Sequence, residues 1–360
     1  MRFSIYLNPQ TRGREEDVPI IETTIGQALQ ATRAGVEGLL LTEHHFSGYN
    51  TYGNNFMLGC HLAALTPPGT MYFMGVAVPP LHQPLRLAQS CTLLDILTRG
   101  NCVIGFGPGG SAVEYTGLGR DPGTRREEMM ENLDVLEAAL AKQDDGSVYD
   151  WKTRHDKGSL RTRIMPSPYS PDGVKFARAT STDTSAAWAG SKGWFLMTAR
   201  DLSPAVGTRL KVYTDALVEA GYDDAYVQHR LDWSLCQKQI IIRDTDREAE
   251  RFARHLMVEM GERQKRNFNQ NTHDPEAAQY MKTVVSVSPQ NPDEFLKYAM
   301  FVGTADTVAE QIAEYEAAGL RHLSVLSNFG YQTAEESGET MDRFLDEVLP
   351  RFRKPAGDPS

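Results

Sequence analysis

The chain has 360 residues and a formal net charge of −10 at pH 7; 41% of its residues are hydrophobic and 23% are charged. This is the composition of a globular protein with enough apolar residues for a full core, and no apolar run reaches the length of a membrane-spanning helix. The acidic balance and the lack of a long basic run argue against nucleic acid or an anionic membrane as partners.

The N-terminus and the cysteines indicate the compartment. The first ten residues, MRFSIYLNPQ, have the pattern of a strand and a turn, not of a signal peptide. The four cysteines are scattered without CxxC spacing: Cys60, Cys91, Cys102 and Cys236. We therefore expect reduced thiols and a cytoplasmic protein.

The apolar pattern predicts strands and helices that alternate along the chain. Short apolar runs such as MYFMGVAVP are typical of buried parallel strands, and longer stripes are typical of amphipathic helices. The predicted order is strand 2–7, helix 20–34, strand 38–46, helix 56–65, strand 70–79, helix 84–100, strand 101–107, helix 125–142, strand 174–180, helix 182–191, strand 194–198, helix 204–220, strand 231–242, helix 246–260, helix 302–318, strand 321–326 and helix 341–349. Eight strands alternating with helices predict an α/β protein, a closed (β/α)8 TIM barrel with insertions, formed by residues 1–360 as a single domain.

Two stretches interrupt the alternation. Residues 144–172 are polar and contain several prolines, which predicts an excursion from the barrel. Residues 261–299 are rich in Asn, Gln, Asp and Pro, and we expect them to form a lid-like insertion beside the active site.

The stretch GLLLTEHHF, residues 38–46, is the first candidate site. Its apolar run ends at Glu43, His44 and His45, so three ionisable side chains follow a buried strand. In parallel α/β proteins the chemistry takes place at the carboxyl ends of the strands. Because adjacent strand residues point to opposite faces, we expect His44 to face the site and His45 to pack sideways or hold its neighbour. A hydrogen-bonded histidine pair without a chemical role is the alternative.

The turn GFGPGG formally matches G-x-G-x-x-G through Gly105, Gly107 and Gly110. A dinucleotide-binding turn requires a helix to begin at once, so that its N-terminus faces a pyrophosphate. Further glycines and a proline delay the next predicted helix to about Thr124, which argues against a dinucleotide. The remaining interpretations are a backbone that approaches a flat or anionic ligand closely, or a simple glycine turn.

Two helix starts could bind an anion. Arg125 and Arg126 stand in a first turn, where the helix dipole disfavours cations unless a phosphate is bound. Solvated pairing with Glu128 or Glu131 is the alternative. The helix predicted at 182–191 begins with several hydroxyl side chains, although one would suffice as a cap. The additional hydroxyls, beside free backbone N–H groups, predict a phosphate-binding site. The hydroxyl residues are Thr180, Ser181, Thr182, Thr184 and Ser185.

Other chemistries lack a motif. The sequence contains neither HExxH nor H-x-H, and the remaining histidines are dispersed, so no metal site is predicted. The nucleophile elbow G-x-S-x-G is absent as well, so a hydrolase is not supported.

With these residues in place, the chain resembles the bacterial luciferase-like, flavin-dependent monooxygenase family along nearly its whole length. The matching segments, in the family's order, are EHHF at 43–46, QPLRLAQSCTLLDILTRG at 83–100, GFGPGG with Glu114, Tyr115 and Gly119 after it, RREEMMENLDVL, the hydroxyl cluster before Ala189 and Gly193, and FVGTADTVAEQIAEYEAAGL with MDRFLDEVLP. The PGG form of the turn looks most like the diketocamphane monooxygenases, which perform Baeyer–Villiger oxidations with reduced FMN from a separate reductase.

The resemblance implies a TIM barrel that binds FMN at the carboxyl ends of its strands. The isoalloxazine ring would lie near a non-prolyl cis peptide between Gly75 and Val76. The phosphate would lie against Thr182, Ser185 and Arg126, with Arg125 as a close competitor. Two departures are Pro108, where an arginine often follows the turn, and Gly107, where luciferases have a reactive cysteine, so light emission is not implied. The implied catalytic residues are His44 and His45, and the implied cofactor-binding residues are Glu43, Gly75, Val76, Gly107, Pro108, Gly109, Arg125, Arg126, Thr180, Ser181, Thr182 and Ser185.

The resemblance also implies the reaction. Reduced FMN, supplied by a separate NAD(P)H:flavin reductase, would react with O₂ to a C4a-(hydro)peroxide whose protonation His44 controls, and one oxygen atom would enter a small organic substrate. A nucleophilic peroxide would attack a ketone or aldehyde, as in a Baeyer–Villiger reaction, and a protonated one a ring or heteroatom. The alternatives are an F420- or NAD(P)H-dependent oxidoreductase on the same barrel and a non-catalytic flavin-binding protein. Family members are commonly dimers, which implies a homodimer or related heterodimer that uses the apolar helices at 56–65 and 85–97, unless these helices only cover the barrel.

Overall fold

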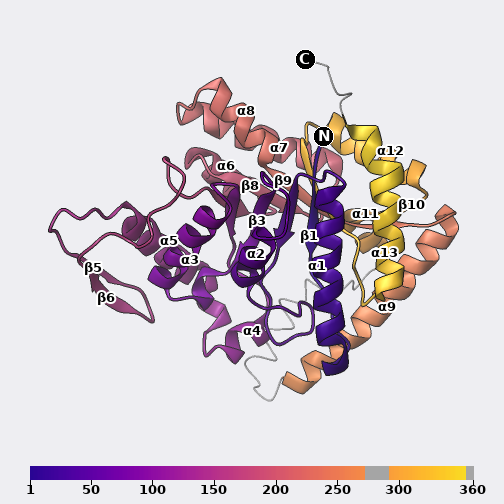
Figure 1. Ribbon diagram of the computed structural model, residues 1–360, viewed down its shortest axis with the longest axis horizontal. Coiled ribbons are helices and arrows are strands. Elements are labelled where there is room, and N and C mark those ends of the chain that lie inside the picture. Colours follow the sequence, from indigo (N-terminus) through magenta and orange to yellow (C-terminus); the bar gives the residue numbers. More distant parts are fainter. Residues whose placement is uncertain (272–291, 354–360) are drawn as a thin grey trace.

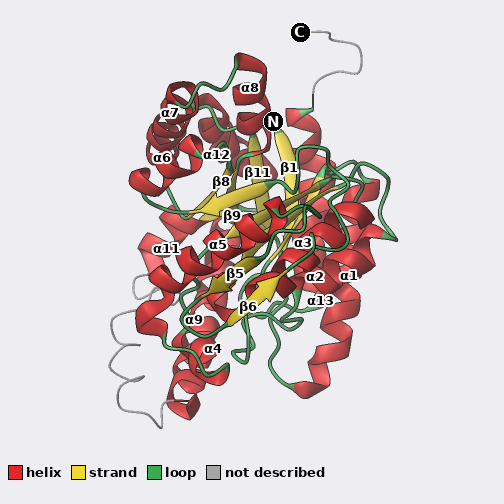
Figure 2. Cartoon of the chain, turned by 90° about the vertical axis from the view of Figure 1, so that its left-hand side faces the viewer, coloured by secondary structure: helices red, strands yellow, loops and turns green. Residues whose placement is uncertain are grey.

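The structure is a computed structural model that describes residues 1–271 and 292–353. Its centre is a barrel of parallel strands surrounded by helices (Figures 1 and 2). The barrel strands are β1 (Arg2–Leu7), β2 (Gly38–Leu41), β3 (Met71–Ala77), β4 (Cys102–Phe106), β7 (Phe176–Ala179), β8 (Phe195–Ala199), β9 (Leu235–Ile242) and β11 (His322–Leu326). They follow one another around the barrel in chain order, and the pairing of β8 with β9 and of β11 with β1 closes the ring. The predicted (β/α)8 barrel is confirmed.

The helices cover the outside of the barrel and explain why its strands are apolar on both faces. In α12, for example, Val308, Ile312 and Tyr315 recur at helical spacing and are buried, and the Thr304 side chain caps the helix by accepting from the Thr307 amide. The helices around the ring are α1 (Asp17–Arg33), α2 (Asn55–Ala63), α3 (Pro84–Leu97), α5 (Arg125–Ala141), α6 (Asp183–Ser191), α7 (Ser203–Glu219), α9 (Asp246–Asn271), α12 (Ala305–Ala317) and α13 (Ala334–Arg343).

Several element boundaries differ from the sequence prediction. Residues 224–233 form helix α8 (Asp224–Trp233), so the strand predicted from 231 begins only at Leu235; Val227 is the one buried residue of α8, and its apolar period is therefore weak. The predicted helix 302–318 includes the end of a strand, β10 (Met300–Gly303), which pairs with β9, and the helix begins after the Thr304 cap.

Two further helices were also mispredicted. The closing helix begins at Ala334, not at 341, because Thr333 and Glu336 form a capping box ahead of a polar first turn. A short helix, α4 (Ala112–Gly117), follows the glycine turn directly, where none was expected before about Thr124. At six residues it is too short to show a period in the sequence.

Both interruptions of the alternation contain regular structure. The excursion holds an antiparallel hairpin, β5 (Tyr149–Lys152) and β6 (Lys157–Leu160), which extends from the barrel in Figure 1. Helix α9 continues through Asn271, and α11 (Pro292–Ala299) precedes β10. The middle of the predicted lid, 272–291, lies outside the described residues. Among the described helices, none combines the length and apolar character needed to cross a bilayer.

The barrel interior is divided into an apolar and a polar sector. In the polar sector, strand register places Ser4 of β1 beside Ser324 of β11, and Ser324 beside Gln237 of β9. The Ser4 hydroxyl lies 3.1 Å from Nε2 of His322. The apolar sector consists of Leu40, Met71, Phe73, Val103, Ala177, Phe195, Met197 and Leu235. The interior can therefore receive a ligand that is apolar on one side and polar on the other.

Candidate active site

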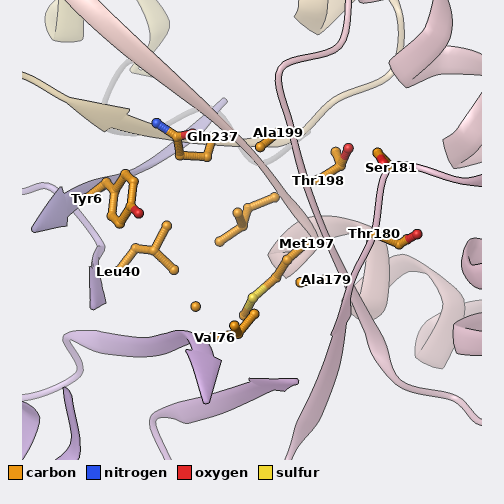
Figure 3. Close-up of a pocket in the computed structure, with 12 residues that line it drawn as sticks. Tyr6, Leu40, Val76, Ala179, Thr180, Ser181, Met197, Thr198, Ala199 and Gln237 are labelled. Carbon is orange, nitrogen blue, oxygen red and sulfur yellow. The ribbon is translucent and has the colours of Figure 1, made fainter. Parts of the chain in front are cut away.

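A pocket lies inside the barrel, toward the carboxyl ends of several strands, with a volume of about 190 Å³. Figure 3 shows Tyr6 and Gln237 at one end, Thr180 and Ser181 at the other, and Met197 between them. The lining residues are Tyr6, Leu40, Gly75, Val76, Ala179, Thr180, Ser181, Met197, Thr198, Ala199, Leu235 and Gln237. Apolar walls between two polar ends suit an elongated ligand with polar groups at its ends.

Strand β3 places a glycine against a neighbouring side chain at this pocket. The peptide bond between Gly75 and Val76 is cis, as the resemblance implied. A Cβ atom on Gly75 would lie 2.3 Å from Cδ1 of Leu40, so a larger residue would displace that side chain. The Val76 carbonyl oxygen accepts a hydrogen bond from Nδ2 of Asn55 at 3.1 Å, which ties β3 to the start of α2.

The carboxylate of Glu43 organises the strand ends beside the pocket. It is 2% exposed, and it accepts hydrogen bonds from the Val78 amide at 2.9 Å and from Nε2 of His82 at 2.8 Å. His45 Nε2 lies 2.9 Å from the same carboxylate. Burial alone would raise the pKa of Glu43, but the histidines and the amide outweigh it and lower the pKa to about 2. The bond to Glu43 in turn raises the pKa of His45.

His44 has a different carboxylate partner. Its Nδ1 lies 2.9 Å from Oε1 of Glu114, which belongs to α4 and is 1% exposed. The ring meets Tyr49 edge-on at 4.9 Å between centroids. About a quarter of the His44 side chain, 26%, remains exposed. Because Nδ1 is held, Nε2 is the ring atom left to face a ligand.

The hydroxyl cluster is built partly of local caps. Thr182 caps α6 by accepting from the Ser185 amide at 3.4 Å, and Thr180 accepts from the Thr182 amide at 3.0 Å. The buried guanidinium of Arg209 donates to the carbonyl oxygen of Ser181 at 2.7 Å and holds this loop in place. Two of the hydroxyl groups at this helix start therefore already serve the backbone, and the phosphate cradle stays a prediction.

The glycine turn closes over the end of β3. A Cβ atom on Gly107 would lie 3.3 Å from the Val76 side chain, and Gly109 has a φ of 63°, a conformation that favours glycine. Pro108 contributes its carbonyl oxygen, which accepts from the Tyr115 hydroxyl at 2.6 Å. The turn is thus fixed in place by α4.

The two predicted arginines lie in different surroundings. Arg125 Nη1 donates to the Pro122 carbonyl oxygen at 2.8 Å, within the turn that precedes α5. Arg126 lies close enough to Arg178 of β7 for its charge to act on that guanidinium.

The structure brings only some of the predicted site residues into the pocket. Gly75, Val76, Thr180 and Ser181 line it. The others lie at neighbouring strand ends, in the glycine turn or at helix starts: Glu43, His44, His45, Gly107, Pro108, Gly109, Arg125, Arg126, Thr182 and Ser185.

Sequence reasoning missed Glu114, Tyr6 and Gln237 as site residues. Glu114 was part of a matching segment but received no role, because its helix was not predicted. Tyr6 and Gln237 sit in strands, and the only signal was a polar side chain at an inward position of an apolar run. Gln237 is 7% exposed, and its Nε2 has no hydrogen-bond partner among the described residues. Burial raises the pKa of Tyr6, which therefore stays a neutral phenol.

Within residues 1–271 and 292–353, no group of three or more His, Cys, Asp or Glu side chains is arranged to hold a metal ion. The four cysteines are free thiols, and three of them are buried.

Comparison with known proteins identifies the family of this chain. A profile of the luciferase-like monooxygenase family matches residues 1–322. Limonene 1,2-monooxygenase of Rhodococcus erythropolis is 26% identical over 256 residues, which cover 71% of this chain and 64% of that protein. The chain therefore spans just under two thirds of the length of that relative.

Solved structures share the fold. The oxygenating constituent of 3,6-diketocamphane monooxygenase from Pseudomonas putida, a type II Baeyer–Villiger enzyme in complex with FMN, has a TM-score of 0.72 at 19% identity and covers 99% of both chains. An F420-dependent secondary alcohol dehydrogenase has a TM-score of 0.71 at 17% identity, covering 98% of this chain and 99% of that one. The family match covers residues 1–322, which is most of the chain. The barrel and the cis peptide of this chain are those that the resemblance implied. This protein therefore belongs to the luciferase-like monooxygenase family.

Proposed function

We propose that this protein is the oxygenating component of a two-component, FMNH₂-dependent monooxygenase that acts on a small organic substrate. The observation that carries the proposal is the pocket itself. It runs from the Gly75–Val76 peptide to the hydroxyls at Thr180 and Ser181, with the His44–Glu114 pair at a neighbouring strand end.

The residues present fit FMN. The apolar wall of Leu40, Val76 and Met197 suits an isoalloxazine ring, and Gly75 carries no side chain to obstruct it. Gln237 offers an unpaired donor to a ring carbonyl. In this proposal the phosphate binds near the start of α6 at Thr182 and Ser185 and near Arg126, with Arg125 as the competing residue.

Reduced FMN, when bound, supplies the two electrons that activate O₂. Nε2 of His44 exchanges a proton with the bound ligand, because Nδ1 is held by Glu114. The Glu114 carboxylate fixes the orientation of the His44 ring. Glu43 and His45 hold the end of β2 against β3 through the Val78 amide. The barrel and its mouth keep water from the reaction.

The partners follow from this chemistry. A separate NAD(P)H:flavin reductase delivers reduced FMN, O₂ is the oxidant, and a ketone, aldehyde, ring or heteroatom accepts the oxygen. A reducing, cytoplasmic compartment belongs to the proposal and is supported by the four free thiols.

A second candidate is an F420-dependent oxidoreductase, which the shared fold of the F420-dependent alcohol dehydrogenase supports. Titration with FMN and F420 separates the two, because only one cofactor should bind in the micromolar range.

The test is to mix the full-length protein with reduced FMN without oxygen, admit air, and follow flavin reoxidation by absorbance. Wild type is expected to delay reoxidation relative to free FMNH₂, and His44→Ala and Glu114→Gln to shorten that delay at least about tenfold. Glu131→Gln, at a partly exposed residue that accepts a hydrogen bond from the Arg154 amide, is the control and should behave as wild type. Reoxidation at the rate of free FMNH₂ in wild type contradicts the proposal and favours F420 or a non-catalytic flavin protein.

A further inference from the structure

A second guanidinium, to which the sequence did not point, lies beside Arg126. Arg178 belongs to β7, and the residues on either side of it face the barrel interior. Because side chains alternate along a strand, Arg178 points outward, toward α5. Its Nη1 lies 2.9 Å from Sδ of Met129 and 3.3 Å from the carbonyl oxygen of Phe106. The guanidinium therefore reaches from β7 to the end of β4, where the glycine turn begins.

Arg126 and Arg178 share the space at the start of α5. Met129 follows Arg126 by about one helical turn, so its contact with Arg178 places both arginines at this helix start. Burial and then the charge of Arg126 lower the pKa of Arg178. Neither guanidinium forms an ion pair with a carboxylate in the described part of the chain. Two adjacent cations without a counterion repel each other, and an anion between them would reverse this penalty.

The start of α6 lies on the same side of the barrel. Helices α5 and α6 both begin at the carboxyl edge of the sheet, and near their other ends Lys192 donates to Glu137 Oε2 at 2.9 Å. The two helices therefore lie side by side, with their N-termini toward the same edge. Arg209, the other arginine near α6, is already paired with Asp183 and Asp201. The positive charge left for an anion comes from α5 and β7.

We propose that Arg178, together with Arg126, binds the phosphate of FMN, so that the site selects the phosphorylated flavin over riboflavin. This inference rests on the proposed flavin function. The carbonyl oxygen of Phe106 orients the guanidinium before the ligand arrives, and its remaining N–H groups form a fork that suits a phosphate. Arg178 is thus a cofactor-binding residue on the outer face of β7.

The experiment is an equilibrium titration of the full-length protein with oxidised FMN and with riboflavin, followed by flavin fluorescence. Arg178→Met keeps much of the aliphatic length but removes the charge. It should weaken FMN binding at least about tenfold and riboflavin binding less than about twofold. If the Met variant does not fold, Arg178→Gln replaces it, because glutamine can still donate to the Phe106 carbonyl oxygen. Arg178→Gln should likewise weaken FMN binding much more than riboflavin binding.

The matched control is Arg120→Met, which removes an arginine that already pairs with Asp156 at 3.7 Å and should leave both affinities unchanged. FMN binding should also weaken more with added salt in wild type than in Arg178→Met.

Three outcomes decide against the inference. Equal FMN affinity in wild type and both Arg178 variants overturns it and leaves the flavin function intact. A parallel loss of FMN and riboflavin affinity also overturns it, because that loss indicates a structural role. If wild type binds neither flavin, the proposed function fails and this inference fails with it.

Discussion

At the scale of single residues, the adjacent histidines differ because they meet different carboxylates. His45 and His82 share the buried Glu43, whereas His44 pairs with Glu114 on another element. Strand alternation in the sequence predicted that the two histidine side chains would point in different directions, and the structure shows which carboxylate each one contacts. The partners could not be predicted, because Glu114 is 70 residues away in sequence.

Glu43 should make the free energy of unfolding depend on pH in the acidic range. Its folded pKa of about 2 lies below the ordinary value of 4.5, so its stabilisation is fully present above pH 4.5 and is lost as pH falls toward 2. The shift corresponds to about 3 kcal/mol. We expect Glu43→Gln to be less stable than wild type at pH 5 by roughly this amount, and the two to converge near pH 2, as measured by urea unfolding.

The matched control is Asp215→Asn, which removes an exposed carboxylate that pairs with Lys211. Its stability should show no such convergence with wild type. His45 has the opposite dependence: its raised pKa gives stability that is complete below about pH 6.5 and is lost as pH rises through the folded pKa. If the difference in unfolding free energy between Glu43→Gln and wild type stays constant from pH 5 to pH 2, the lowered pKa assigned to Glu43 is contradicted.

At the scale of elements, strand β9 places one polar side chain inside the barrel and the next one outside it. Gln237 points into the pocket, and the next residue, Lys238, points to the outer helices. Lys238 is fully buried and donates to the carbonyl oxygens of Asp201 at 2.6 Å and Tyr298 at 2.5 Å. Burial lowers its pKa to about 8.

Substitutions at these two adjacent positions should have opposite effects. Lys238→Met leaves buried carbonyls without their donor and should destabilise the fold by about 1–3 kcal/mol with little change in FMN affinity. Gln237→Leu removes a donor that has no partner among the described residues, so it should keep stability and weaken FMN binding about tenfold. Thermal unfolding and FMN titration measure the two effects. Equal effects of both variants on binding contradict the separation of roles.

At the scale of the whole molecule, exposed apolar residues lie on two neighbouring helices. Leu93 and Leu97 of α3, 45% and 47% exposed, are four residues apart and so share one face. Met57 of α2, which packs against α3, is 71% exposed. This surface matches the helices that the resemblance implied as an interface, and we keep the dimer as a prediction.

A charged substitution should separate such a dimer. Leu93→Glu combined with Leu97→Glu would bury two carboxylates in the interface and should shift the protein from dimer to monomer in size-exclusion chromatography with light scattering. Val218→Glu, on the exposed face of α7 at 57%, is the control and should leave the mass unchanged. A wild type that elutes as a monomer at micromolar concentration contradicts the prediction.

The sequence by itself determined the features that depend on local pattern. Apolar runs that end in polar residues located the barrel strands, and alternation with helices identified the closed barrel. The same logic placed the EHH end of β2 and the hydroxyl-rich start of α6, and each lies at the predicted end of its element. The cis peptide at Gly75, in contrast, was implied by the family resemblance, and the structure confirms it.

Only the tertiary structure decided which distant residues meet. The pairing of His44 with Glu114, the unpaired donor of Gln237 in the pocket and the approach of Arg178 to Arg126 all join separate elements. Helix α8 and strand β10 were missed for a related reason: their short or polar patterns become regular only through contacts with the rest of the chain. Ring closure and strand register set these contacts, and no local sequence pattern records them.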